Sequence, residues 1–307
     1  MKMQIERPGC TKAWSFLQPG RGQSPDLGGA GGLQFRNIRF APSGDCRDCA
    51  KMAEKQKENR YKRGESRRRE GGEEQEEKSM KYERIEKAVF MERPNRFIAY
   101  AVINGKKETI HVKNTGRCAE LLIPGAAIYV QESGNPARKT KWDLIAVEKG
   151  ERLINMDSQI PNQVVKEWIE KGNFAPDVTL IRPETVYGSS RFDLYVEAGE
   201  RKIFIEVKGV TLEENGVARF PDAPTQRGVK HVEELIRAHE AGFEAGILFV
   251  IQMKRARRVE PNWRTHEAFG EALQKAQAAG VKVLAYDCRV DPDLLELDEP
   301  VEVAVER

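Results

Sequence analysis

Three charged residues lie in two stretches of β-forming sequence at a spacing that suits phosphodiester chemistry. Asp193 lies in the segment RFDLYVE, and Glu206 and Lys208 lie in the segment IFIEVKG. Residues two apart in a strand leave it on the same face, so Glu206 and Lys208 project together. The turn AGER at 198–201 folds the two segments into a hairpin that brings Asp193 to the same end. Two carboxylates can ligate a hard divalent cation, and a neighbouring ammonium can stabilise the negative charge that develops during hydrolysis.

The spacing alone, D-x12-E-x-K, also fits an ordinary ion pair on the exposed face of a hairpin. Its surroundings favour a functional site. The strand with Glu206 and Lys208 is otherwise apolar, which predicts a central position where an unpaired charge is costly. Gly209 permits close approach of another segment. Glu184, at the end of the preceding predicted strand, adds a third carboxylate, and three acids around one point repel unless a cation joins them.

We therefore expect a Mg²⁺ or Mn²⁺ site with oxygen ligands and the catalytic residues Asp193, Glu206, Lys208 and Glu184. Asp193 and Glu206 would ligate the ion together with the carbonyl of Val207. Glu184 would ligate it directly, act through water or bind a second ion. Lys208 would lower the pKa of the attacking water or stabilise the transition state. The cluster has no His or Cys, which argues against zinc.

The pattern over residues 153–307 predicts the elements that must position this hairpin. Apolar residues recur at helical spacing in three segments, and β-forming runs separate them. We predict helices over 160–172, 226–242 and 265–280, strands over 177–186, 245–252 and 281–287, a loop over 213–224 and an edge strand, VEVAV at 301–305, at the end of the acidic tail 291–307. A hairpin joined to a helix–strand–helix–strand unit predicts an α/β (α+β) domain, with a mixed sheet and flanking helices.

Residues 80–152 instead contain short β-rich segments, at 88–93, 96–103, 106–112, 126–132 and 140–148. Asn104-Gly105 between the second and third is a strong hairpin signal. Five strands in so short a region predict a small barrel, with the OB-fold as the leading candidate.

Polar and basic residues near both predicted domains suggest nucleic acid, DNA or RNA, as the partner. Thr225 is expected to cap the helix that starts near Gln226, and helix N-termini bind phosphate. Arg227 and Lys230 add cationic reach there. We predict contacts to nucleic acid from Thr225, Arg227, Lys230, Arg96, Lys139 and Lys141. On the barrel, aromatic residues could stack bases, although about half of them are expected in its core; these are Phe97, Tyr100, Tyr129 and Trp142.

Composition separates residues 1–79 from the remainder of the 307-residue chain. They carry 17 Lys and Arg against 12 Asp and Glu, a net charge of +5 within a total of +3. Their low apolar content predicts a disordered extension. The Cys46-x-x-Cys49 pair has no second pair, so an isolated CxxC without function is the simpler interpretation. Scattered cysteines and the lack of a long apolar run favour a cytoplasmic protein without a membrane span. No P-loop or Ser-His-Asp pattern is present.

From about Met80 onward the sequence resembles the sugar fermentation stimulation protein (SfsA) family. The resemblance rests on NPARKTKWDL, SRFDLYVE, IFIEVKGVTL, RFPDAPTQRGVKH and VKVLAYD. It implies an N-terminal OB-like domain and a C-terminal domain of the PD-(D/E)xK nuclease fold. It carries over Glu184, Asp193, Glu206 and Lys208 as motif positions, and Lys230 and the Thr225–Arg227 turn less closely. Gln226 stands where the family often has Glu.

The resemblance implies two functions that the sequence leaves open. One is a metal-dependent DNA or RNA nuclease, which the intact catalytic triplet favours. The other is a non-catalytic, sequence-nonspecific DNA-binding regulator of sugar (maltose) metabolism, in which the barrel holds single strands. The predicted organisation is an extension over 1–79, an OB-like nucleic-acid-binding domain over 80–152 and a nuclease-like domain over 153–307. The oligomeric state does not follow from the sequence.

The sequence around Met80 predicts that translation of the native gene starts there. MKYERIEKAVF reads as an ordinary protein start, and the preceding REGGEEQEEK is what a purine-rich ribosome-binding region gives when translated. Intact-mass measurement of protein expressed from its native gene should give the mass of residues 80–307. A mass matching the full 307 residues would contradict the prediction.

Overall fold

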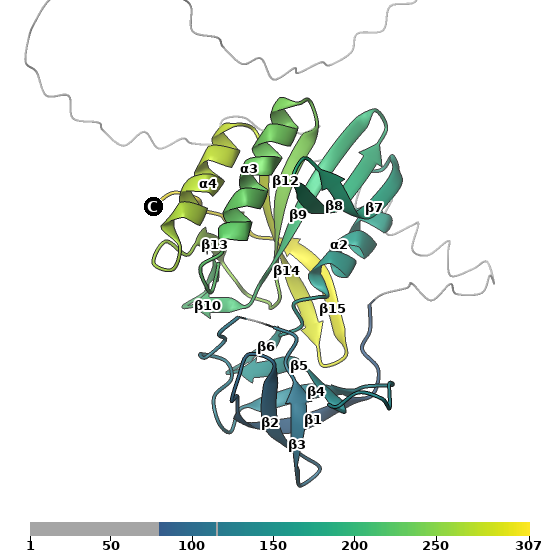
Figure 1. Ribbon diagram of the computed structural model, residues 1–307, viewed down its shortest axis with the longest axis vertical. Coiled ribbons are helices and arrows are strands. Elements are labelled where there is room, and N and C mark those ends of the chain that lie inside the picture. The colour runs from purple at the N-terminus through teal and green to yellow at the C-terminus, as the bar shows by residue number, and fades with distance from the viewer. Residues whose placement is uncertain (1–79, 115) are drawn as a thin grey trace, which may run out of the picture. The chain divides into compact units, whose positions relative to one another are not determined.

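The computed structural model describes residues 80–114 and 116–307, drawn in colour in Figure 1. The predicted extension over 1–79, with Cys46 and Cys49, lies outside the described residues. Within the described part of the chain, no helix is long and apolar enough to cross a membrane.

The first part of the described chain is a closed β-barrel. Its six-stranded sheet has the order β3-β2-β1-β4-β5-β6, and a parallel pairing of β3 with β5 closes it. The strands are β1 (Ile85–Glu92), β2 (Ile98–Ile103), β3 (Lys106–His111), β4 (Ala127–Glu132), β5 (Trp142–Lys149) and β6 (Arg152–Asn155). The predicted hairpin at Asn104-Gly105 is confirmed, because both residues have the positive φ angles, 50° and 77°, that its tight turn requires. The barrel sheet continues through β6 as far as Asn155.

The second part is built on a six-stranded mixed sheet with the order β15-β14-β12-β9-β8-β7. Its strands are β7 (Val178–Tyr187), β8 (Ser190–Ala198), β9 (Arg201–Val210), β12 (Glu244–Ile251), β14 (Lys282–Asp291) and β15 (Leu294–Pro300). The hairpin of β8 and β9 has the predicted turn, with Gly199 at φ 57°. β9 pairs with β8 antiparallel and with β12 parallel, so the strand that carries Glu206 is central, as its apolar sequence predicts.

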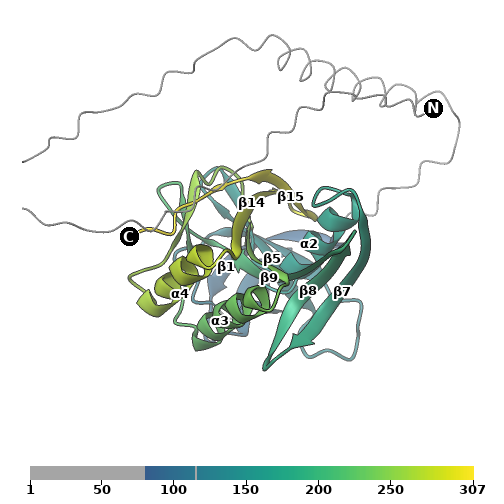
Figure 2. The same cartoon turned by 90° about the horizontal axis from the view of Figure 1, so that it is seen from above.

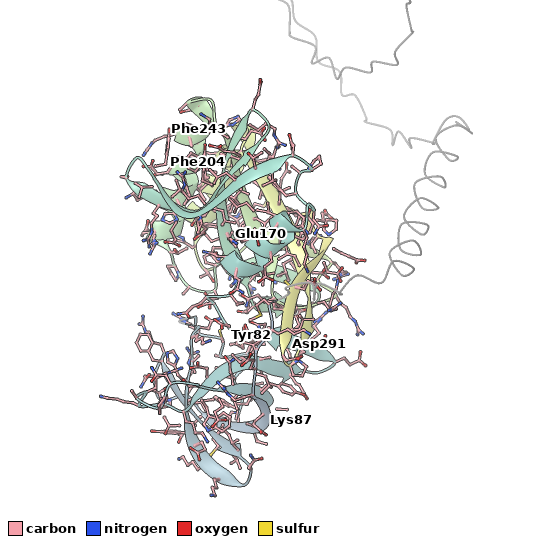
Figure 3. All side chains as sticks on the ribbon, turned by 90° about the vertical axis from the view of Figure 1, so that its right-hand side faces the viewer. Tyr82, Lys87, Glu170, Phe204, Phe243 and Asp291 are labelled. Atoms are coloured by element: carbon pink, nitrogen blue, oxygen red, sulfur yellow. The ribbon has the colours of Figure 1, made fainter. Side chains whose placement is uncertain are left out.

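Helices cover both faces of this sheet (Figures 1 and 2). α2 (Pro161–Glu170) packs on one face, while α3 (Gln226–Glu240) and α4 (Glu267–Ala278) pack on the other. β9 alternates between the two cores. Ile205 and Val207 belong to the core with α2, and Phe204 belongs to the core with α3. Figure 3 shows Phe204 beside Phe243, and their ring centroids are 5.1 Å apart.

Two segments differ from the prediction. The expected loop 213–224 contains a short hairpin, and in the acidic tail a strand over 294–300 precedes the edge strand expected at 301–305. β10 (Leu212–Glu214), β11 (Val217–Phe220), β13 (Arg258–Pro261) and β16 (Glu302–Val303) form a separate four-stranded sheet. β15 pairs antiparallel with β14 at the sheet edge. Both segments mix charged residues with buried apolar ones such as Val217 and Leu295, and this mixed composition concealed their strands.

The barrel and the mixed sheet meet at a buried polar junction under the end of β9. The side chain of Gln252 donates to the carbonyls of Asn155 and Asp157, at 3.2 and 2.9 Å. The backbone N–H of Tyr82 donates to the carbonyl of Asp293. Figure 3 labels Tyr82 and the nearby Asp291. Gly209 leaves room for this junction, since a Cβ there would lie 2.5 Å from Gln252 Oε1 and 3.0 Å from Pro161 Cγ.

Gly209→Ala should therefore destabilise the protein. The added methyl group would displace the buried Gln252 amide from its partners, and overpacking of this kind costs about 1–3 kcal/mol of unfolding free energy. Urea unfolding measures the loss. Gly246→Ala on the adjacent strand is the control, because its Cβ would meet nothing closer than 3.4 Å and should cost clearly less. Equal losses for the two variants would show that the junction is not tightly packed.

Candidate metal centre

The site begins where β8 separates from β9. The pairing of the two strands runs from the turn to Leu194 and Ile205, and it stops before Asp193. The carboxylate of Asp193 fills the gap in the ladder, because its Oδ2 accepts a hydrogen bond of 2.8 Å from the backbone N–H of Val207. Its Oδ1 accepts a 2.8 Å hydrogen bond from Asn162, at the start of α2. Asp193 is thus fixed beside the strand that carries the other two residues.

Glu206 is a buried carboxylate in the middle of the sheet, with 1% of its surface exposed. Its Oε1 lies 2.5 Å from the ammonium of Lys208 and accepts a hydrogen bond from His231 Nδ1. Its Oε2 is buried and has no hydrogen-bond partner among the described residues. Burial raises the pKa of Glu206, but the hydrogen bond from His231 and the charge of Lys208 outweigh it and hold the pKa below its ordinary value. Glu206 is therefore ionised near neutral pH and keeps one unpartnered oxygen.

Asp193 and Glu206 repel each other. Burial raises the pKa of Asp193 above its ordinary value, and the charge of Glu206 adds to this, while Lys208 and the hydrogen bond from Val207 oppose it. Two carboxylates in one site are typical of a place that a cation completes. The side chain of Lys208 is 16% exposed, so the site opens to solvent at its ammonium end.

His231 joins this site, which corrects the expectation that the cluster contains no histidine. Arg227 Nε lies 3.3 Å from His231 Nε2. Because a guanidinium can only donate, Nε2 must accept, and the proton is assigned to Nδ1, which donates to Glu206. The sequence contains one sign of this burial. At helical spacing, His231 shares the face of α3 with the buried residues Leu235 and Ala238.

Glu184 lies at the edge of this site. It falls between the pairs Pro183–Leu194 and Thr185–Phe192, and thus across from Asp193 on the neighbouring strand. Its side chain is 50% exposed and forms a 2.7 Å ion pair with Arg191. Its φ of 55° is uncommon outside glycine. In this arrangement Glu184 forms its ion pair with Arg191 rather than with a group of the Asp193–Glu206 cluster.

The residues predicted to contact nucleic acid on α3 have local partners. Thr225 caps the helix as predicted, and its hydroxyl accepts a 3.0 Å hydrogen bond from Gly228 N–H. Arg227 contacts His231, and Lys230 donates to the carbonyl of Ser189 at 3.0 Å, so it holds the β7–β8 turn.

The predicted barrel contacts divide by exposure. Arg96 and Lys139 are exposed, and Lys141 is exposed and pairs with Glu132 at 2.9 Å. Of the aromatic residues considered for stacking, Phe97 is 51% exposed and Trp142 only 6%. Trp142 therefore belongs to the barrel core.

The donor atoms at the centre suit a hard cation. Asp193 and Glu206 offer carboxylate oxygens, and Oε2 of Glu206 is buried without a partner in the part that the structure describes. The backbone of Val207 lies beside them, because its N–H donates to Asp193. In the described part of the chain, no group of three or more His, Cys, Asp or Glu side chains converges as a metal cluster. A cation here would thus depend on two carboxylates, with backbone oxygen and water completing its shell.

A closed barrel followed by a mixed α/β domain with this hairpin defines a two-part protein with OB and restriction-endonuclease-type domains. The family models agree: the SfsA N-terminal OB domain matches residues 91–156, and the sugar fermentation stimulation protein RE domain matches residues 159–294. A sugar fermentation stimulation protein homolog of Clostridium beijerinckii is 58% identical over 224 residues, which cover 73% of this chain and 99% of the relative. The chain belongs to the sugar fermentation stimulation protein family.

Two further relatives extend the comparison. The homolog of Ruminiclostridium cellulolyticum is 56% identical over 224 residues, with 73% of this chain and 99% of the relative covered. The solved structure of Pyrococcus furiosus SfsA in complex with Ca²⁺ is 27% identical, with a TM-score of 0.67, and the match covers 73% of this chain and 98% of that chain.

Asp193→Asn should raise the thermal stability of the metal-free protein near neutral pH. The raised pKa means that the ionised form of Asp193 destabilises the fold, because the folded state binds the proton of this carboxyl more tightly than the unfolded state does. The ionised carboxylate therefore lowers the free energy of unfolding as the pH rises from the pKa of Asp193 in the unfolded chain through its higher pKa in the folded protein. The gain in stability should grow as the pH rises above about 4 and vanish below it.

Thermal melting in chelator at several pH values measures this effect. The exposed Asp291→Asn variant on β14 is the control, and its melting temperature should stay close to that of the wild type. A fall in stability of the Asp193→Asn variant at pH 7 would show that Asp193 serves the fold instead.

Proposed function

We propose that the protein is a metal-dependent nuclease that hydrolyses phosphodiester bonds in DNA or RNA. The observation that carries the proposal is the buried, unpartnered Oε2 of Glu206 beside the repelling carboxylate of Asp193. Groups that destabilise a fold are expected at sites that serve a function. A cation bound between these two carboxylates would offset their repulsion.

Asp193 and Glu206 would hold Mg²⁺ or Mn²⁺, with the carbonyl of Val207 as a further oxygen ligand. The Ca²⁺ complex of the Pyrococcus furiosus relative supports a preference for a hard, oxygen-liganded cation in this family. When bound, such a cation supplies Lewis-acid polarisation of the phosphate and a lowered pKa for a bound water.

The chain's own residues have separate roles around that centre. Lys208 is partly exposed and next to Glu206, so its ammonium can stabilise the charge that develops on a phosphate oxygen. His231 acts as a positioning residue, since its Nδ1–H fixes Oε1 of Glu206 and leaves Oε2 for the cation. Asn162 and the N–H of Val207 hold Asp193 in the same way.

The proposed substrate is nucleic acid because the barrel is of OB type and the catalytic part is of restriction-endonuclease type. OB barrels commonly bind single strands, and Phe97 and Lys139 on this barrel are exposed for such contact. The barrel would hold the strand and the mixed sheet would cut it.

Purified protein should cleave labelled DNA or RNA in Mg²⁺ or Mn²⁺ and not in chelator. Asp193→Ala and Lys208→Ala should each lower the rate by about 100-fold or more, because each removes a group that stabilises the transition state. Lys275→Ala on α4 is a matched control that removes a lysine from another helix and should leave the rate unchanged.

Equal rates for the wild type and both site variants would reject the site. Salt-dependent binding that persists in chelator, with no cleavage in either metal, would favour the non-catalytic DNA-binding alternative.

A further inference from the structure

A cavity of about 680 Å³ lies where the barrel, the β10–β11 hairpin and the chain after β12 meet. Four cations line it, Lys149 and Arg152 from the barrel and Arg255 and Arg257 from the run KRARR that follows β12. The other lining residues come from distant parts of the chain, so the run alone does not reveal the cavity.

A buried carboxylate organises two of these cations. Glu213, 2% exposed, accepts from Lys149 at 3.1 Å and from Arg152 at 2.8 Å. Burial raises the pKa of Glu213, but the hydrogen bond from Gly216 N–H and that from Lys149 outweigh it and hold the pKa below its ordinary value. The carboxylate stays charged and fixes both cations at the cavity wall.

Among the residues that the structure describes, the other two cations, Arg257 and Arg255, have no buried carboxylate as a partner. Arg257 donates to the carbonyl of Asn215 at 2.7 Å, which fixes its position without neutralising its charge. Arg255 is 68% exposed and forms a 3.1 Å ion pair with Glu151, which is 88% exposed, so solvent screens the contact strongly.

Carboxylates at the rim offset only part of this charge. Glu120 and Glu214 also line the cavity. Glu214 is itself paired with two further arginines, Arg219 at 2.9 Å and Arg264 at 2.7 Å. With Glu213, three carboxylates face four cations, so the lining keeps an excess of one positive charge.

The cavity lies at the same end of the sheet as the candidate metal centre. β9 and β12 are parallel, with Lys208 beside Phe249 and Val210 beside Ile251. The cavity residues Glu213–Gly216 and Arg255–Arg257 follow the carboxyl ends of these two strands. In α/β sheets, ligands bind outside the carboxyl ends of adjacent parallel strands.

We propose that this cavity binds the phosphodiester backbone of the nucleic-acid strand whose cleavable bond lies at Lys208, a proposal that rests on the proposed nuclease function. The lining residues are four cations, three carboxylates, Asn215 and Gly216, with no aromatic side chain to stack a base, so the cavity is suited to phosphates and not to bases. Binding there is independent of sequence and releases counterions, which makes it sensitive to salt.

Fluorescence anisotropy with a labelled single-stranded DNA of about 20 nucleotides, in chelator, separates binding from cleavage. Arg255→Ala and Arg257→Ala should each weaken binding by about five-fold and lower the slope of log affinity against log salt by about 1. Arg255→Lys keeps the charge and should restore most of the affinity. Lys282→Ala at the opposite end of the sheet, where the lysine is 56% exposed, is the control and should bind like the wild type.

Unchanged affinity and salt slope in both arginine variants, with native melting temperatures, would overturn the cavity proposal even if the wild type cleaves DNA. Lost affinity in these variants, with no cleavage by the wild type, would retain the cavity and reject the nuclease function. Equal weakening by Lys282→Ala would also overturn the proposal, because it would show a general charge effect.

Discussion

The structure depends on one constraint, the burial of the Glu206 carboxylate in the central strand of the mixed sheet. Removing such a charge from water costs several kcal/mol unless partners compensate. His231 and Lys208 provide that compensation, and each is placed by a different part of the fold. α3, capped by Thr225, carries His231 to β9, and the strand's own alternation brings Lys208 to the same face. The compensation is incomplete, because only one carboxylate oxygen is satisfied.

The incomplete compensation gives the site its chemical character. Asp193 substitutes for a missing carbonyl in the β8–β9 ladder, which places a second carboxylate against Glu206 at some cost in stability. A divalent cation would satisfy both groups. Nearby, Gly209 allows the buried Gln252 junction to lie directly under the same strand, so the barrel is held close to the centre. Gly209 and Glu206, both on β9, thus link the position of the barrel to that of the candidate metal centre.

The sequence predicted the parts that depend on local pattern. The triplet Asp193, Glu206 and Lys208 could be found because strand alternation and the hairpin turn fix their faces, and the structure brings them together. His231 could not be assigned with equal ease, because its contact with Glu206 depends on how α3 docks on the sheet. The cavity around Glu213 is built from four separate segments, which no local pattern reveals. Glu184 was placed in the right strand, but its positive φ and its ion pair with Arg191 depend on backbone detail that residue type does not specify.

The central claim is that Asp193 and Glu206 form one binding site for a divalent cation. The most direct measurement is a crystal structure of residues 80–307 determined in the presence of Ca²⁺. We expect one ion within about 2.3–2.6 Å of oxygens of both Asp193 and Glu206, including Oε2 of Glu206. Crystals that show no ion between these carboxylates at saturating Ca²⁺, with Oε2 of Glu206 instead bonded to protein or water, would contradict it.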